Sequence, residues 1–180
     1  MKVNSLQELY VEQLRDLYDA EHQIIKALPE MINAATSVEL KQALTEHLDV
    51  TTVQATRLEN IFTTLGQKAK GEKCKGIAGV LDEGSDLVGK VNEPEVRDAA
   101  IIASAQRVEH YEIAGYGTAR TFATLLEDEE AGKLLQQTLA EEKEADQKLT
   151  GLAEEINVHA AGKSVASEGR GKSPRKISAA

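Results

Sequence analysis

Apolar residues recur every three or four positions along four long stretches of the chain, which is the spacing that places them on one face of an α-helix. Glycine, proline or charged residues separate the stretches, which cover approximately residues 5–34, 36–65, 94–126 and 128–156. The pattern is typical of long amphipathic helices, and no stretch shows the alternation of a half-buried strand. The sequence therefore predicts an all-α protein.

Residue types at the ends of these stretches agree with helix boundaries. Thr36 and Glu39 have the spacing of a capping box at the start of the second helix. Pro94 fits the first turn of the third helix, and Asp128 fits the N-cap of the fourth. Pro29 lies inside the first helix, where we expect a kink because proline has no amide hydrogen to donate.

The second and third long helices are separated by a long connection. Its first part is charged and contains glycine, and residues 77–91 predict a short helix that Gly79, Gly84 and Gly89 weaken. Two helical hairpins joined in this way predict a ferritin-like four-helix bundle with a short extra helix in the crossover. We expect residues 1–156 to form this single domain and residues 157–180 to form a basic, disordered tail, because the tail has little apolar content.

Charge and cysteine content narrow the functional classes. The formal net charge of -9 argues against general nucleic-acid binding, and the basic tail alone predicts only weak, salt-sensitive attraction to nucleic acid. Cys74 has no second cysteine to pair with, and the N-terminus lacks the apolar segment of a signal peptide. No apolar run is long enough to span a membrane. We expect a soluble cytoplasmic protein with no membrane association.

The apolar stripes of the four helices are interrupted by acids and one histidine. These candidate metal ligands are Glu21, His47, Glu109, Glu112, Glu142 and Asp146. Each lies near the middle of its helix, so antiparallel packing is expected to gather them in one layer of the core. Five carboxylates in a dry layer need neutralisation, and carboxylate oxygen with imidazole nitrogen suits iron or manganese. The pattern predicts one or two such ions per chain.

Other interpretations of these residues remain open. Glu142 and Asp146 lie in the acid-rich segment AEEKEAD, where the charges could face solvent. His47 is equally consistent with a core or interface histidine. Tyr18 and Tyr116 lie within a turn of predicted ligands and either hydrogen-bond them or fill the core. No arginine or lysine is predicted to face the acids.

Three segments resemble the YciE/YciF group of bacterial ferritin-like stress proteins. They are LYVEQLRDLYDAEHQIIKALPEM, EHLDVTTVQATRLENIF and, most specifically, AQRVEHYEIAGYGTAR, and the resemblance covers about residues 5–156. It implies a rubrerythrin-like bundle that forms homodimers, binds metal in its core and takes part in stress responses, without an established reaction.

The ferritin-like pattern can be carried over residue by residue. It implies that Glu21 from the first helix, and Glu109 and Glu112 from the third, are ligands. Glu142 and Asp146 would supply the fourth helix. In the second helix the pattern implies a glutamate and a histidine, but the inward residues are Thr51 and Gln54, with His47 one turn earlier as the alternative ligand. A symmetric di-iron centre, an asymmetric centre and a single metal site all remain open.

The leading hypothesis is a cytoplasmic, stress-associated protein that holds iron or manganese and either consumes a small oxidant, peroxide or oxygen, or simply stores the metal. Rubredoxin-type cysteine pairs are absent, which excludes electron delivery through a second iron centre of that kind within the chain. The alternative is a non-catalytic dimeric scaffold or interaction protein. The sequence leaves enzymatic activity undecided.

Overall fold

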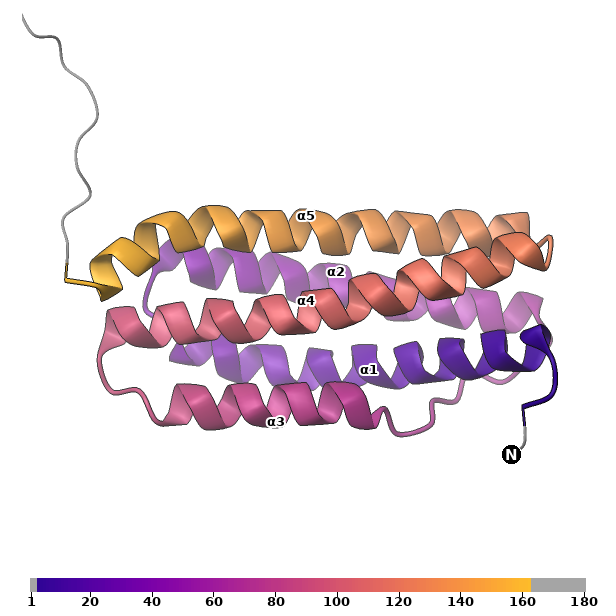
Figure 1. Cartoon of the computed structure of the whole chain (residues 1–180), viewed down its shortest axis with the longest axis horizontal. Coiled ribbons are helices and arrows are strands. Elements are labelled where there is room, and N and C mark those ends of the chain that lie inside the picture. The colour runs from indigo at the N-terminus through magenta and orange to yellow at the C-terminus, as the bar shows by residue number, and fades with distance from the viewer. Residues whose placement is uncertain (1–2, 163–180) are drawn as a thin grey trace, which may run out of the picture.

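Five helices account for nearly all of the chain that the computed structural model describes, residues 3–162 (Figure 1). They are α1 (Leu6–Ala34), α2 (Val38–Thr64), α3 (Lys75–Gly89), α4 (Pro94–Leu125) and α5 (Glu129–Ala160). These residues contain no strand. The predicted all-α class is confirmed, and the four long helices and the short crossover helix lie where the apolar periodicity placed them.

The helices run side by side along the long axis of the molecule (Figure 1). α1 and α2 form one antiparallel hairpin, and α4 and α5 form the other. α3 lies in the long connection between the hairpins and packs on α1 and α4. Because α3 carries the chain back along the bundle, α4 runs parallel to α2. This order is that of the predicted bundle with a long crossover.

The start of α2 differs from the predicted capping box. Ser37, not Thr36, is the N-cap, and its hydroxyl accepts a hydrogen bond from the Leu40 amide at 3.2 Å. Thr36 instead donates its amide and its hydroxyl to the two carboxylate oxygens of Asp98 on α4, at 2.7 and 2.6 Å. The local pattern misplaced the cap by one residue because a distant acid in the sequence binds Thr36.

Two further boundaries can be compared with the prediction. Pro29 lies within α1, which continues to Ala34, so the proline does not end the helix. α5 continues to Ala160, past the predicted start of the tail at residue 157. The remaining part of the predicted disordered tail, residues 163–180, lies outside the described residues.

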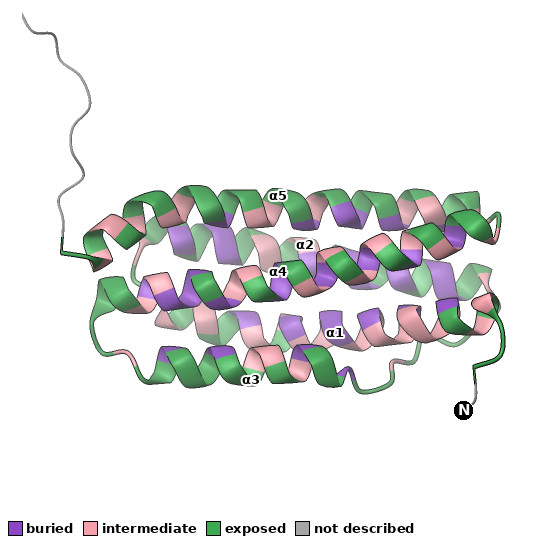
Figure 2. Ribbon diagram, viewed as in Figure 1, coloured by how far each residue is buried: buried purple, intermediate pink, exposed green. Residues whose placement is uncertain are grey.

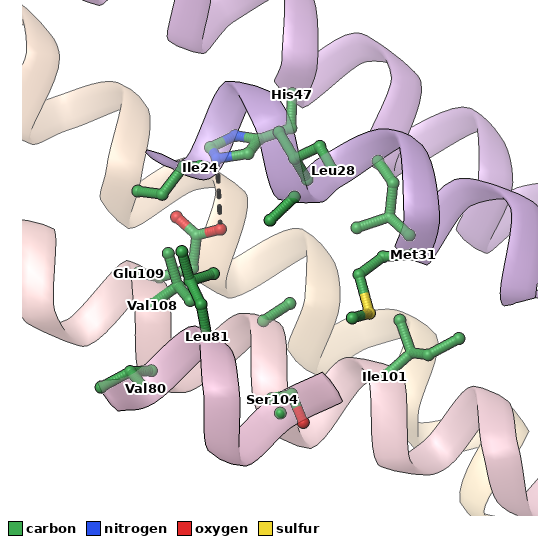
Figure 3. Close-up of a pocket in the computed structure, with 14 residues that line it drawn as sticks. Ile24, Leu28, Met31, His47, Val80, Leu81, Ile101, Ser104, Val108 and Glu109 are labelled. Atoms are coloured by element: carbon green, nitrogen blue, oxygen red, sulfur yellow. Dashed lines mark ion pairs between the residues drawn. The ribbon is translucent and has the colours of Figure 1, made fainter. Parts of the chain in front are cut away.

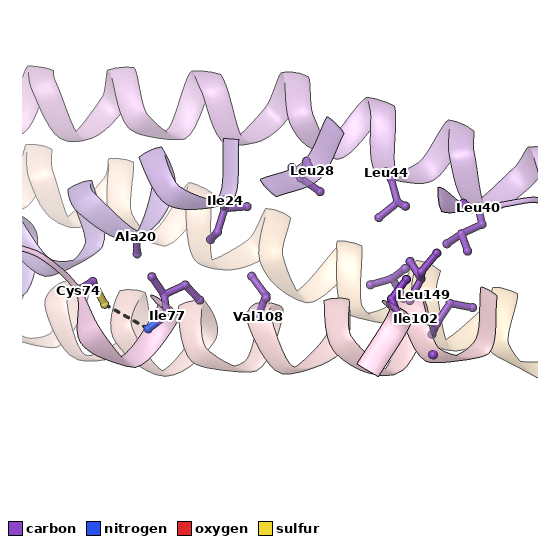
Figure 4. Close-up of a cluster of buried hydrophobic side chains, with 14 residues drawn as sticks. Ala20, Ile24, Leu28, Leu40, Leu44, Cys74, Ile77, Ile102, Val108 and Leu149 are labelled. Carbon is purple, nitrogen blue, oxygen red and sulfur yellow. Dashed lines mark hydrogen bonds between the residues drawn. The ribbon is translucent and has the colours of Figure 1, made fainter. Parts of the chain in front are cut away.

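The core consists of two apolar clusters. One contains Ile24, Leu44, Ile102 and Leu149 (Figure 4), and the other contains Leu14, Leu58, Ala119 and Leu135. Each long helix carries buried positions along its length (Figure 2), and on each of them buried polar side chains lie between the residues of the two clusters. These polar residues are Glu21, Thr51, Gln54, Glu109, Glu112, Thr138 and Glu142. A polar layer therefore divides the hydrophobic core near its middle.

Within residues 3–162, none of the helices combines the length and the apolar character that a membrane span requires.

Candidate metal centre

Four of the six predicted ligands come together in the polar layer. His47 extends from α2, Glu109 and Glu112 from α4, and Glu142 from α5, and one ligand atom from each lies within 4.8 Å of the others. The three-residue spacing of Glu109 and Glu112 places both on the same face of α4. Three carboxylates and one imidazole thus surround a single position in the core.

The acids of this cluster are almost completely removed from solvent. Glu109, Glu112 and Glu142 are 2%, 1% and 0% exposed. Glu109 Oε2, both carboxylate oxygens of Glu112 and Glu142 Oε2 have no hydrogen-bond partner among the described residues. Buried polar atoms without partners are rare in proteins because each carries a desolvation cost. Their convergence on one position is what a cation-binding site requires.

The His47 side chain, 10% exposed, completes the cluster from the other hairpin. Its Nε2 lies 3.4 Å from Glu109 Oε1 and makes no hydrogen bond with any described residue (Figure 3). Burial lowers the pKa of His47 below its usual value, although the nearby carboxyl group of Glu142 opposes this change. The imidazole is therefore held neutral, which is the form that coordinates a metal.

Burial also controls the ionisation of the acids. It raises the pKa of Glu109 and of Glu112 well above the usual range, and neighbouring acids add to the effect. A group of carboxyl groups in this state either holds protons or is neutralised by a cation. The residues present fit a divalent ion of iron or manganese, since both accept carboxylate oxygen and imidazole nitrogen.

Glu21 lies in the same layer but outside the group of four. It is fully buried, and its Oε1 accepts a hydrogen bond from the hydroxyl of Tyr116. Its Oε2 has no partner in the part of the chain that the structure describes. Burial and the carboxyl group of Glu142 raise the pKa of Glu21. Tyr116 therefore contacts a predicted ligand, whereas the hydroxyl of Tyr18 donates to Glu59 at the surface, at 2.8 Å.

Asp146 is not brought into the cluster. Its side chain is 22% exposed, and its Oδ1 accepts a hydrogen bond from Gln106 Nε2 at 3.0 Å and lies 3.4 Å from His110 Nε2. Four residues along a helix correspond to a rotation that overshoots one turn by about 40°. That offset directs Asp146 away from Glu142 and toward the edge of α4.

Hydrogen bonds of two α2 side chains near the layer, Arg57 and Gln54, were not predicted from the sequence. Arg57 on α2 forms two hydrogen bonds with the carboxylate of Glu141 on α5, at 2.5 and 2.8 Å. Gln54 Nε2 donates to Glu142 Oε1 and lies 3.3 Å from Glu141 Oε2. The expectation that no arginine faces the acids was therefore wrong. The spacing of Gln54 and Arg57 on one face of α2 was the available signal.

Comparison with known proteins identifies chains that are similar to this one. The sequence model of a domain of unknown function, DUF892, matches residues 5–161. Protein YciF of Escherichia coli strain K12 is 40% identical over 154 residues, which cover 85% of this chain and 93% of YciF.

Solved structures agree with the sequence comparison. The crystal structure of the E. coli stress protein YciF has a TM-score of 0.83 at 39% identity, covering 86% of this chain and 98% of that one. YcfI of Rhodopseudomonas palustris has a TM-score of 0.81 at 44% identity, covering 83% and 95%. A two-domain protein of Anabaena variabilis that contains a ferritin-like domain has a TM-score of 0.58 at 15% identity, covering 96% of this chain and 42% of that one. The fold is ferritin-like.

Proposed function

The chain belongs to the DUF892 family, and from this relationship and its buried acid cluster we propose that it is a cytoplasmic, stress-associated protein that binds iron or manganese in the bundle core. The stress association rests on its similarity to the E. coli stress protein YciF. The metal rests on one observation, the convergence of buried ligand atoms without partners among the described residues at His47, Glu109, Glu112 and Glu142.

These four residues would hold one ion. Glu21 offers a further buried oxygen in the same layer, so a second ion next to the first is part of the proposal. A bound iron or manganese would supply redox chemistry toward a small oxidant, peroxide or dioxygen. The surrounding side chains fix the ligands: Gln54 orients Glu142 through a hydrogen bond, and Tyr116 does the same for Glu21.

An alternative function is a helical scaffold without metal chemistry, a structural role of the kind suggested for YcfI. The observation that favours it is Arg57, whose charge lies close enough to the polar layer to lower the pKa of Glu21 against the larger effect of burial. However, Arg57 is already paired with Glu141, so it does not neutralise the cluster of four. We also propose that the protein forms a homodimer in either role.

Elemental analysis tests the metal proposal. The untagged protein, purified and then incubated with ferrous iron or manganese, is expected to retain one or two ions per chain after desalting. The double variant Glu109→Ala, Glu112→Ala is expected to retain none. A double variant of exposed acids on α5, Glu130→Ala with Glu154→Ala, serves as the matched control and should bind as the original chain does. An original chain that stays metal-free under both conditions would establish the scaffold alternative.

A further inference from the structure

Two cavities reach His47 and Glu109, and their walls differ in chemistry. One lies between α2 and α5, and its wall combines aliphatic residues with the charged side chains of Glu46, Glu141, Glu144 and Lys148. The other lies beneath α3 and is lined almost entirely by aliphatic side chains. His47 and Glu109 therefore border both a cavity that contains charged groups and one whose wall is almost entirely aliphatic.

Residues of four helices line the cavity beneath α3, which is partly open to solvent. Most of its wall is aliphatic and comes from α1, α3 and α4: Ile24, Leu28, Met31, Val80, Leu81, Ile101 and Val108. The imidazole of His47 and the carboxylate of Glu109 lie at one end (Figure 3). Ser104 is also in the wall, but its hydroxyl is engaged with the carbonyl oxygen of Ala100 at 2.9 Å. A molecule inside would meet alkyl groups everywhere except at the cluster.

α3 covers part of this cavity with Val80, Leu81 and Gly84. At Gly84 it approaches α4 so closely that a Cβ atom there would lie 3.0 Å from the Cβ of Ser104. α3 packs on α1 and α4 and buries Ile77, Gly84 and Val88. Without α3, the aliphatic groups of α1 and α4 that line the cavity would face solvent.

The size and lining of the cavity restrict its occupant. Its volume is about 40 Å³, and a water molecule needs roughly 10–15 Å³ on the same measure, so there is room for a molecule of only a few heavy atoms. Hydrogen peroxide carries two O–H donors and would lose hydrogen bonds to water against alkyl walls. Dioxygen has no donor and little polarity, so it loses none.

We propose that the cavity beneath α3 binds a small, uncharged, apolar molecule of the size of dioxygen, next to His47 and Glu109. A role of this cavity in oxidation rests on the proposed function. In that role, dioxygen and not peroxide is the oxidant that reaches the cluster from this side. The cavity between α2 and α5 offers a polar molecule or a cation the partners that the cavity beneath α3 lacks, the charged groups of Glu46, Glu141, Glu144 and Lys148.

Xenon binding tests the cavity without any metal. Metal-free protein with labelled methyl groups is placed under xenon, and the methyl resonances of Ile24, Leu28, Val80 and Val108 are expected to shift. Ala105→Leu and Ala27→Leu each add side-chain volume to the wall from a different helix and should abolish these shifts. Ala103→Leu, at an exposed position of α4, is the matched control and should leave them unchanged. Unshifted resonances in the original chain would overturn the proposal.

Oxidation of the ferrous-loaded protein tests the choice of oxidant. The Ala105→Leu variant is expected to slow oxidation by dioxygen and to leave oxidation by hydrogen peroxide unchanged. The Ala27→Leu variant is expected to do the same, and it replaces Ala105→Leu if that variant folds poorly. Equal effects on both oxidants, or no effect on either, would overturn the assignment of dioxygen to this cavity. A chain that binds xenon in the cavity but retains no metal would support the cavity and contradict the proposed function, so the two failures are distinguishable.

Discussion

Gln54 donates a hydrogen bond from its side-chain amide to Oε1 of Glu142, across the contact between α2 and α5. Both residues are buried, and the same amide lies near Glu141, which Arg57 holds in place. A largely buried arginine is thus connected through Glu141 and Gln54 to a carboxylate of the cluster. The ferritin-like pattern implies a metal ligand at this part of α2, and Gln54 instead supplies a hydrogen-bond donor to a ligand.

Replacement of Gln54 by alanine is expected to weaken metal binding while leaving all four proposed ligands in place. Loss of an outer hydrogen bond to a ligand typically lowers metal affinity by about 10- to 100-fold. Competitive titration against a chelator of known affinity measures the change. Gln42→Ala is the control, because Gln42 is exposed on the same helix and its side chain bonds Glu46, outside the cluster. Unchanged affinity in Gln54→Ala would mean that this hydrogen bond does not orient Glu142.

The metal-free protein should lose stability as the pH rises. The folded-state pKa values of Glu21, Glu109 and Glu112 are raised above the ordinary value of 4.5. Between that value and the folded-state values, the folded chain binds more protons than the unfolded chain. The contribution of these groups to stability is therefore full below about pH 4.5 and is lost as the pH rises through the folded-state pKa values.

Urea unfolding of the metal-free chain at a series of pH values measures this loss. Glu112→Gln removes one of the titrating groups and should make the metal-free protein more stable at neutral pH and less dependent on pH. Bound metal should reduce the dependence in the original chain, since it binds the deprotonated carboxylates. If the free energy of unfolding of the metal-free chain increased from pH 5 to pH 8, and Glu112→Gln reduced that increase, the burial of protonated acids in the layer would be contradicted.

Two glycines of α3 should respond in opposite directions to alanine. A Cβ at Gly76 would lie 2.6 Å from the ring of Tyr111, whose hydroxyl is fixed by Asp16 and by the thiol of Cys74. Gly76→Ala is expected to destabilise the protein by about 1–3 kcal/mol through overpacking. Nothing lies within 4 Å of a Cβ at Gly79, so Gly79→Ala should stabilise it by about 0.5–1 kcal/mol through helix propensity.

Thermal and urea unfolding of the two variants, side by side, measure the difference. Equal effects would show that α3 does not pack against Tyr111 as described.

Asp98 should be important for stability and not for metal binding. It is 3% exposed and accepts hydrogen bonds from the amide and hydroxyl of Thr36 and from the amide of Ser37. Asp98→Ala would leave these donors without their acceptor, at a cost of about 3 kcal/mol. Metal stoichiometry at saturating metal should be unchanged.

Urea unfolding and elemental analysis of Asp98→Ala separate these two effects. Ser37→Ala is the comparison, because it removes the side-chain cap of α2 and an exposed hydrogen bond to Glu39 but keeps the amide that bonds Asp98, and it should cost about 1 kcal/mol. A larger loss in Ser37→Ala than in Asp98→Ala would contradict the role assigned to the acid.

The sequence was sufficient to predict what depends on helical periodicity. Glu109 and Glu112 could be placed inside the bundle because they share a stripe with buried residues such as Tyr116 and Ala119. The limits of the helix wheel appear at Asp146, where an angular offset from Glu142 was enough to change which neighbours the side chain meets. Small rotations around a helix decide whether an acid is central or peripheral, and periodicity alone does not resolve them.

Contacts between helices could not be predicted in the same way. Whether His47 meets the acids depends on how α2 packs against α1 and α5, which no local pattern specifies. Arg57 was missed because its long side chain reaches an acid of another helix from a position near the boundary of the core. Thr36 was assigned a local role for a similar reason, since its actual partner lies 62 residues later.

The polar layer between the two apolar clusters also fixes how the helices align lengthwise. Aliphatic side chains packing on aliphatic side chains allow a helix to slide by one turn, about 5.4 Å, with little loss of contact. Such a slide would move the carboxyl groups of Glu21, Glu112 or Glu142 out of the layer and against alkyl groups, where they would have neither a cation nor a hydrogen-bond partner. The acids thus select a single lengthwise alignment of the bundle, and a cation bound among them would lock that alignment by joining α2, α4 and α5 at one point.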